Sequence, residues 1–298
     1  MNKKIFSAIF IAAIFAFAVY FIVSPKNDSY VDTGNETIST PKGKSEPKES
    51  TDTRLQAHSI EASNNTKPFE DIPFALAKSR ALSGDQESQL LLSKMYDYCF
   101  LYNLNPHATL AQLSEMGNAD PKCGVRVGKI KEELTAKCAS VDDGKPIPAE
   151  AVTLWIEQSA KQGQLTAQIR HAVYSQEKDE KRLLSYVATL RANPRLDAVF
   201  EMGALSRLVE PYWKDANTKA AFSESGYSEY AWQLAACRAG LDCTATSLNT
   251  SAMVFQGGCS YDNYEQYILD QAVSPQGRKN LEETIAIIQR EFLSKKAR

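Results

Sequence analysis

The sequence predicts an all-α domain that follows one transmembrane helix and a disordered linker. Beyond Pro68, apolar residues recur every three or four positions, which is the period of an amphipathic helix. Glycine and proline interrupt this pattern at intervals that suit helical hairpins, and no pair of β-strands is predicted. We therefore expect three regions, at residues 1–23, 24–67 and 68–298.

The first region has the features of a signal anchor. Lys3 and Lys4 precede an uncharged run of 19 residues at positions 5–23. As a helix this run would reach about 28 Å, close to the hydrocarbon thickness of a bilayer. The two lysines favour the cytoplasmic side, so a single-pass protein of a bacterial inner membrane would carry its C-terminal domain in the periplasm.

Cleavage of the leader is the alternative. The tripeptide at residues 16–18, Ala-Phe-Ala, fits the cleavage pattern of a signal peptide, and cleavage would give a secreted protein. The apolar run continues to Val23, which favours the uncleaved anchor. Both alternatives export the rest of the chain.

The second region, residues 24–67, has a different composition. Ser, Thr, Asn, Lys and Glu dominate it, Pro25, Pro41 and Pro47 interrupt it, and Tyr30 is its one aromatic residue. Such a segment cannot bury enough apolar surface to offset the entropy of ordering. It is predicted to be a disordered tether, with an r.m.s. span of roughly 35–40 Å as a flexible coil.

In the third region, the helical period is clearest in three stretches. Their apolar faces comprise Val152, Trp155, Ile156 and Ser159; Leu183, Val187 and Leu190; and Leu281, Ile285, Ile288 and Phe292. The predicted breaks between helices are Gly84, Asn105-Pro106, Gly117, Gly144-Lys145-Pro146, Gly163, Asn193-Pro194, Gly240, Gly257-Gly258 and Ser274-Pro275.

A weak internal repeat is centred on four of these glycines. A small residue stands three positions before each glycine, namely Ala81, Ser114, Ala160 and Cys237. Four positions after Gly84, Gly163 and Gly240, where the next helix would begin, come Ser88, Ala167 and Thr244. Glycine can supply the left-handed residue that ends a helix, and small residues let two helices approach closely. Trp155 and Trp232 each lie eight residues before their glycine.

At these residues the chain resembles the Sel1-like repeat family, relatives of the tetratricopeptide repeats. The clearest stretches are residues 81–90 and 155–168, with a weaker match at 238–242. The resemblance covers about half of the C-terminal domain and lacks the family's glycine-rich loop within each unit, so the repeats are degenerate. It implies helical hairpins stacked as a short, irregular α/α solenoid whose concave surface holds a protein or peptide partner.

Six cysteines follow the predicted anchor: Cys99, Cys123, Cys138, Cys237, Cys243 and Cys259. An even number in an exported chain is most simply interpreted as disulfides. Buried free thiols are the alternative, whereas a zinc site is disfavoured because no C-x-x-C motif occurs. Six cysteines allow 15 pairings. A bridge from Cys237 to Cys243 across Gly240 is the best single prediction.

No catalytic, cofactor-binding or metal-binding residue is predicted, and the protein is expected not to be an enzyme. His58, His107 and His171 belong to no catalytic motif. Three adjacent carboxylate pairs occur: Glu132-Glu133, Asp142-Asp143 and Glu282-Glu283. On a helix such neighbours point about 100° apart, and Asp142-Asp143 precedes Gly144 in a predicted turn. The net charge of −2 gives no indication of nucleic-acid binding.

An aromatic cluster is the one candidate contact surface. Its members flank the predicted Cys237 turn and follow Cys259: Tyr227, Tyr230, Trp232, Tyr261, Tyr264 and Tyr267. Packing between neighbouring helices would explain them, and so would an amphipathic surface for a partner, since Tyr and Trp supply much interface energy.

The sequence therefore favours a membrane-tethered periplasmic module that binds a protein or peptide. An immunity protein that neutralises a toxin and a scaffold for envelope assembly are two versions of this hypothesis. The alternative is an exported helical hydrolase acting on the cell wall, which would need two carboxylates about 5–10 Å apart in a pocket.

Overall fold

The computed structural model describes residues 72–223, 227–250, 252–255 and 258–294, all within one unit, Ser59–Arg298. The predicted membrane helix at 5–23, the predicted linker at 24–67 and His58 lie outside the described residues. Within the described part of the chain, no helix combines the length and the apolar character that a bilayer crossing requires.

The described residues form an all-α domain, which confirms the all-α part of the prediction. Its helices are α2 (Phe74–Leu82), α3 (Gln86–Leu104), α4 (Pro106–Ala119), α5 (Pro121–Cys138), α6 (Ala149–Lys161), α7 (Leu165–Tyr174), α8 (Glu180–Ala192), α9 (Leu196–Val209), α10 (Ser228–Arg238), α11 (Ala252–Phe255), α12 (Tyr264–Tyr267) and α13 (Gly277–Ile288). In these residues, β-pairing is limited to an isolated bridge between Thr244 and Asn263.

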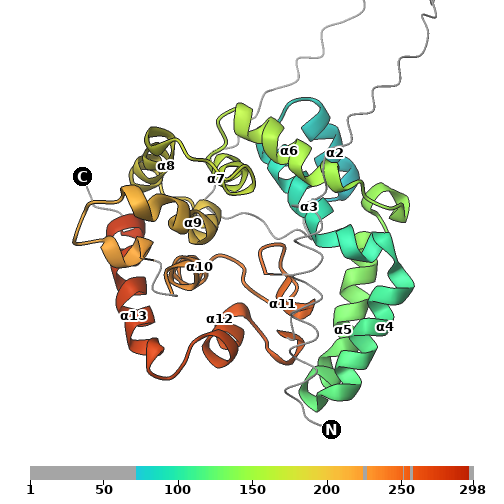
Figure 1. Ribbon diagram of the computed structural model, residues 1–298. Coiled ribbons are helices and arrows are strands. Elements are labelled where there is room, and N and C mark those ends of the chain that lie inside the picture. Colours follow the sequence, from blue (N-terminus) through green and yellow to red (C-terminus); the bar gives the residue numbers. More distant parts are fainter. Residues whose placement is uncertain (1–71, 224–226, 251, 256–257, 295–298) are drawn as a thin grey trace, which may run out of the picture. The chain divides into compact units, whose positions relative to one another are not determined.

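The helices pack as adjacent pairs (Figure 1). Contacts run from α2 to α3, from α3 to α6, and on through α7, α9, α10 and α13. The α4–α5 hairpin lies between α3 and α6 in the sequence, and both of its helices contact α3. The predicted apolar faces of α6, α8 and α13 point inward, except that Trp155 is half-buried.

Two matching turns join the first pairs. Gly84 and Gly163 have φ of +94° and +93°, so each supplies the left-handed residue after a helix, as predicted. Asp85 and Gln164 then cap the next helices by accepting hydrogen bonds from the amides of Ser88 and Ala167.

These two turns also contact each other. The Ser159 hydroxyl donates to the carbonyl of Gln86 at 2.8 Å, and the Gln162 amide donates to Oε1 of Gln89 at 2.9 Å. Each bond crosses 73 positions of sequence. The Gly84 and Gly163 turns therefore lie side by side.

Two predicted features of the repeat are wrong. Gly117 ends no helix, because α4 continues to Ala119. Its role is close packing: a Cβ at Gly117 would lie 2.9 Å from Cγ1 of Val127, and a Cβ at Gly124 would lie 2.8 Å from the Gly117 carbonyl oxygen. Gly240 does end α10, with φ of +111°, but Thr244 starts a turn-rich segment and not a helix. The third match therefore lacks its second helix.

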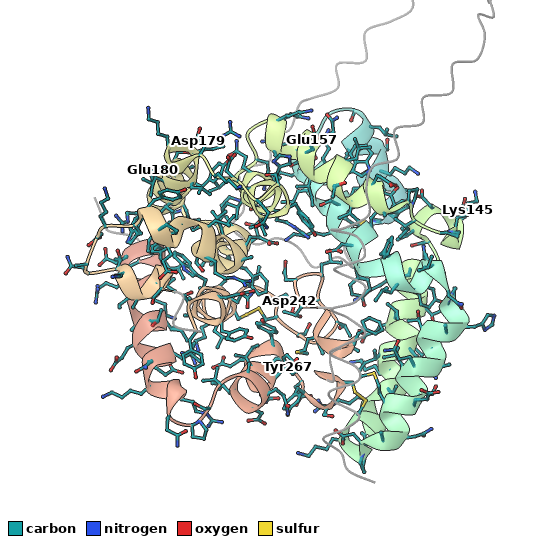
Figure 2. The ribbon with its side chains drawn as sticks, in the orientation of Figure 1. Lys145, Glu157, Asp179, Glu180, Asp242 and Tyr267 are labelled. Carbon is teal, nitrogen blue, oxygen red and sulfur yellow. A yellow bond between two sulfur atoms is a disulfide. The ribbon has the colours of Figure 1, made fainter. Side chains whose placement is uncertain are left out.

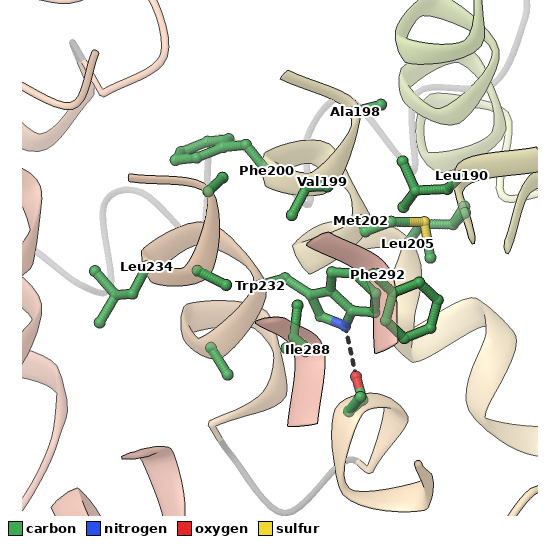
Figure 3. Close-up of a cluster of buried hydrophobic side chains, with 14 of the residues drawn as sticks. Leu190, Ala198, Val199, Phe200, Met202, Leu205, Trp232, Leu234, Ile288 and Phe292 are labelled. Atoms are coloured by element: carbon green, nitrogen blue, oxygen red, sulfur yellow. Dashed lines mark hydrogen bonds between the residues drawn. The ribbon is translucent and has the colours of Figure 1, made fainter. Parts of the chain in front are cut away.

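Two hydrophobic clusters form the core. One gathers α2 to α6, and the other gathers α7 to α10 with α13. In the second cluster Trp232 is fully buried between Phe222 and Phe292, with ring centroids 5.6 and 4.7 Å away (Figure 3). Its indole N–H donates to the carbonyl of Ala221 at 2.6 Å. Trp232 is therefore a core residue and does not belong to a contact surface.

All six cysteines form disulfides: Cys99–Cys138, Cys123–Cys259 and Cys237–Cys243. The bridge across Gly240 is the one that the spacing predicts. The other two fix both ends of α5, one to α3 and one to the segment before α12. Three disulfides indicate an oxidising compartment outside the cytoplasm.

The longest and the shortest disulfide loops differ widely in length. Cys123–Cys259 spans 136 positions of sequence and Cys237–Cys243 spans 6. In the chain-entropy description, replacing both cysteines by serine should cost about 5 kcal/mol for the long loop and about 2 kcal/mol for the short one. Urea unfolding of the two double-serine variants measures this difference. Equal losses would show that loop length does not control the stabilisation.

A second prediction concerns the α9–α10 contact. A Cβ at Gly203 would lie 2.7 Å from the Glu229 carbonyl oxygen, so Gly203→Ala should force the helices apart and cost about 1–3 kcal/mol. Gly128 is the matched control, because a Cβ there meets nothing within 4 Å. Gly128→Ala should stabilise α5 by about 0.5–1 kcal/mol through helix propensity. Thermal unfolding of both variants tests the pair, and a harmless Gly203→Ala would contradict the close approach.

Candidate functional site

Four of the predicted aromatic residues come together on α10 and around α12. Tyr267 is the last residue of α12 (Figure 2). Its ring centroid lies 5.8 Å from that of Tyr261 and 6.4 Å from that of Tyr264. Tyr230, near the start of α10, is close enough to influence the ionisation of Tyr264 and Tyr267. All four side chains are half-buried. We call these four residues the tyrosine surface.

Hydrogen bonds and packing hold the rings in place. The Tyr264 hydroxyl donates to Oε1 of Gln233 at 2.6 Å, and its ring packs against Phe200 at 5.9 Å. The Tyr261 hydroxyl accepts from the Gln271 amide at 2.7 Å. Among the described residues, the hydroxyls of Tyr230 and Tyr267 have no hydrogen-bond partner. They are therefore free to bond to another molecule.

The hydroxyls of Tyr230, Tyr264 and Tyr267 stay neutral at physiological pH, because the pKa of each is raised above its ordinary value. Burial raises the pKa of Tyr264 far above its ordinary value, and nearby Tyr230 and Glu229 raise it further. Burial is also the largest cause that raises the pKa of Tyr230 and Tyr267. The surface thus offers uncharged rings and neutral hydroxyl groups.

The remaining two predicted members lie elsewhere. Trp232 is in the core. The Tyr227 hydroxyl lies 3.5 Å from that of Ser274, and its ring covers Gly277, where a Cβ would lie 2.3 Å from the Tyr227 oxygen. Tyr227 therefore packs α10 onto the start of α13.

A double ion pair joins α10 to α12 and α13. The guanidinium of Arg238, at the end of α10, lies 2.6 Å from a carboxylate oxygen of Glu265 on α12 and 2.6 Å from one of Glu282 on α13. The neighbouring Cys237–Cys243 bridge holds Cys243, whose carbonyl accepts from the Tyr264 amide at 2.9 Å. The position of α12 is thus set by covalent, ionic and backbone contacts.

Sequence reasoning missed a second polar cluster, which lies between α3, α7 and α9. Lys94 and Asp197 are 8% and 4% exposed. The Lys94 ammonium donates to Oδ1 of Asn249 at 2.9 Å, while Asp197 accepts from Thr166 at 2.8 Å and from Arg195 at 3.3 Å. The signal available in the sequence was a charged residue within an apolar helical stretch, as with Asp197 before residues 198–200.

Lys94 and Asp197 affect each other's pKa. Burial lowers the pKa of Lys94 despite the attraction of Asp197 and Glu201. Burial opposes ionisation of Asp197 too, but the charges of Lys94 and Arg195 and the bonds from Arg195 and Thr166 hold its pKa below the ordinary value. The cluster joins helices of both core clusters, which gives it a structural role.

At least one carboxylate in each acidic pair considered as a catalytic group is engaged in another contact. Asp142 and Asp143 lie in a turn with φ of 47° and 58°, and the Asp142 carboxylate accepts from Lys78 and from the Tyr96 hydroxyl. Glu133 lies near Lys129, and Glu282 pairs with Arg238. In the described ranges, no group of His, Cys, Asp or Glu is arranged to hold a metal ion.

Comparison with known proteins gives no assignment: the chain matches no protein-family model, no curated protein and no solved structure. The resemblance to Sel1-like repeats remains a prediction. The function is therefore argued from the residues themselves.

The buried cluster predicts a pH dependence of stability. Because the pKa of Asp197 is lower in the folded chain, its stabilisation is present above about pH 4 and is lost as the pH falls through the folded-state pKa. Asp197→Asn should cost about 3–5 kcal/mol at pH 7, since it removes the main negative charge beside the buried Lys94, whereas Arg195 keeps Glu87 as its partner. In this variant the free energy of unfolding should also fall less steeply than in the unmodified chain as the pH drops below about 4.

The matched control is Asp143→Asn, because the Asp143 side chain is 89% exposed and Asn accepts a left-handed conformation. This variant should keep the free energy of unfolding and its pH dependence. Urea unfolding between pH 2.5 and pH 7 compares the two substitutions. If the free energy of unfolding of Asp197→Asn falls with decreasing pH as steeply as that of the unmodified chain, the role assigned to this carboxylate is contradicted.

Proposed function

We propose that this chain is an exported protein-binding module tethered to a bacterial inner membrane, and that the tyrosine surface is its contact site. The observation that carries the proposal is the fixed group of half-buried tyrosines on α10 and around α12. Tyr supplies large contact area with few rotatable bonds, so rings that are already held in place lose little entropy on binding. The free hydroxyls of Tyr230 and Tyr267 add hydrogen-bonding capacity.

The arrangement of helices supports a repeat protein as the scaffold. The Gly84 and Gly163 turns have the same left-handed glycine, the same type of cap and direct contacts with each other. We infer a short, irregular solenoid of degenerate Sel1-like units, interrupted by the α4–α5 hairpin. Repeat proteins of this kind commonly present extended surfaces to other proteins.

The location also belongs to the proposal. Three disulfides support export, and the apolar run at 5–23 with Lys3 and Lys4 supports an anchor with the domain in the periplasm. A tethered module in this compartment suits an immunity protein against an incoming toxin or a scaffold for envelope assembly.

Affinity capture tests the proposal. The full chain with a C-terminal tag should retain a stoichiometric protein from envelope extracts, identified by mass spectrometry. Tyr267→Ala should weaken this retention by roughly 30-fold if the ring is a central contact, since such truncations cost about 2 kcal/mol.

The control is Tyr174→Ala, because Tyr174 is an exposed tyrosine on α7, outside the tyrosine surface. This variant should retain the partner as the unmodified chain does. A partner lost equally from both variants would argue against this contact site. A chain that captures no protein and instead cleaves peptidoglycan would favour the hydrolase.

A further inference from the structure

We propose that Cys237–Cys243 is an exchangeable disulfide: a dithiol opens it while the other two bridges stay closed, and its opening loosens α12 and with it the tyrosine surface. The consequence for partner binding rests on the proposed function, whereas the chemistry of the bridge does not. Three observations carry the inference: the burial of the six cysteines, the place of each bridge in the fold, and the contacts of the segment that begins at Cys243.

The three bridges differ in their access to solvent. The four cysteines of the two longer bridges are each at most 2% exposed. Cys243 is 8% exposed, and Cys237 is only half-buried. In thiol–disulfide exchange a thiolate must reach a sulfur atom, so the rate depends on access. Cys237–Cys243 is therefore the bridge that a thiol reaches first in the folded chain.

Opening this bridge should leave the fold in place. It spans 6 positions of sequence against 136 for Cys123–Cys259, and the shorter loop constrains the unfolded chain less. Both ends of α5 remain fixed by the other two bridges. On α10 itself, Trp232 keeps its packing against Phe222 and Phe292, because none of these residues lies in the loop that the bridge closes. Reduction is thus expected to be a local event.

The bridge fixes the direction in which the chain leaves α10. Gly240 ends the helix with φ of +111°, and the bridge then holds Cys243 near Cys237, with Cα atoms 5.6 Å apart. Glycine has access to more backbone conformations than any other residue, so it does not hold this turn by itself. Residues 243–250 contain turns and no helix. Once the bridge is open, the start of this segment can move.

The same segment carries backbone contacts of α12. The Tyr264 amide donates to the Cys243 carbonyl at 2.9 Å, and the Ala245 amide donates to the Asp262 carbonyl at 3.3 Å. Movement of Cys243 therefore takes away the partner of the first amide of α12. Because α12 carries the rings of Tyr264 and Tyr267, the arrangement of the tyrosine surface changes with it.

A second contact limits the movement. At the far end of the segment, Oδ1 of Asn249 accepts from the Lys94 ammonium at 2.9 Å. Breaking this bond would leave a buried cation with one partner fewer, which is costly. The end of the segment therefore stays with α3, and the displacement is greatest near Cys243. This anchor keeps the two cysteines within reach of each other, so oxidation can close the bridge again.

The exchange takes place in two steps. A thiolate of the dithiol attacks Sγ of Cys237, the disulfide bond breaks, and its electron pair leaves on Sγ of Cys243, which takes up a proton. The second thiolate of the dithiol then attacks the mixed disulfide and releases Cys237, which is protonated in turn. The dithiol loses two electrons and two protons and becomes a disulfide, and the bridge gains them and becomes two thiols.

Dithiothreitol is the probe for the reactivity of the bridge. The folded full chain is incubated with it, thiols are trapped with iodoacetamide, and mass spectrometry identifies the labelled cysteines. Cys237 and Cys243 should become labelled at least about 10-fold faster than the other four, with the circular dichroism of the helices unchanged. Opening of all three bridges at one rate, or no opening without a denaturant, would overturn the inference.

Hydrogen exchange measures the loosening of α12. After reduction, the Tyr264 amide should exchange at least about 10-fold faster, whereas peptides from α6 should not change. The double variant Cys237→Ser/Cys243→Ser should exchange as the reduced chain does, and dithiothreitol should change it no further. Unchanged exchange at Tyr264 after reduction would disprove the link between the bridge and α12. A further change in the double variant would assign the effect to another bridge.

Partner capture separates this inference from the proposed function. The unmodified chain should retain less partner after reduction, and the double-serine variant should retain equally little with and without dithiothreitol. If the bridge opens and α12 loosens while retention is unchanged, the proposed function stands and the redox control of binding is wrong. If no protein is captured under either condition while the bridge opens selectively, the exchangeable disulfide stands and the proposed function fails.

Discussion

The close approach of α9 and α10 is the contact on which the candidate site depends. It is possible because Gly203 has no side chain, so that the Glu229 carbonyl occupies the space of a Cβ. The start of α10 is thereby fixed, and with it Glu229 and Tyr230. The same helix places Trp232 in the core and ends at Arg238, which binds both α12 and α13. One helix thus connects the core to the tyrosine surface.

Covalent bonds compensate for the short elements around that surface. Helix α12 (Tyr264–Tyr267) continues directly into a π-helical segment, Ile268–Ala272, and a helical stretch of this combined length is only marginally stable by itself in water. Asn263 caps it, Cys243 binds its first amide, and the bridges at Cys243 and Cys259 restrict the segment that leads to it. The disulfides therefore restrict the chain that carries Tyr261, Tyr264 and Tyr267.

The sequence predicted those features that follow from local chemistry. Helical periods identified the buried faces of α8 and α13, and glycine identified the left-handed turns at Gly84, Gly163 and Gly240. The prediction that Gly117 ends a helix was wrong, because glycine occurs both in turns and where two helices cross closely, and its spacing in the sequence does not distinguish the two. Trp232 and Tyr230 are two residues apart on α10, yet one is buried and the other lies at the surface. Which face of α10 meets α9 depends on long-range packing, which no local pattern reports.

The buried cluster of Lys94 and Asp197 shows why tertiary structure adds information about charge. In the sequence each residue is an ordinary charged position, and only the tertiary structure, in which they are 8% and 4% exposed, removes both from water. Removal from water is costly unless the charges meet partners, and here Asn249, Arg195 and Thr166 supply them. Asn249 comes from the turn-rich segment that follows the Cys237–Cys243 bridge. The disulfide that positions α12 therefore also begins the segment that satisfies Lys94, so the stability of the core and the geometry of the tyrosine surface depend on the same stretch of chain.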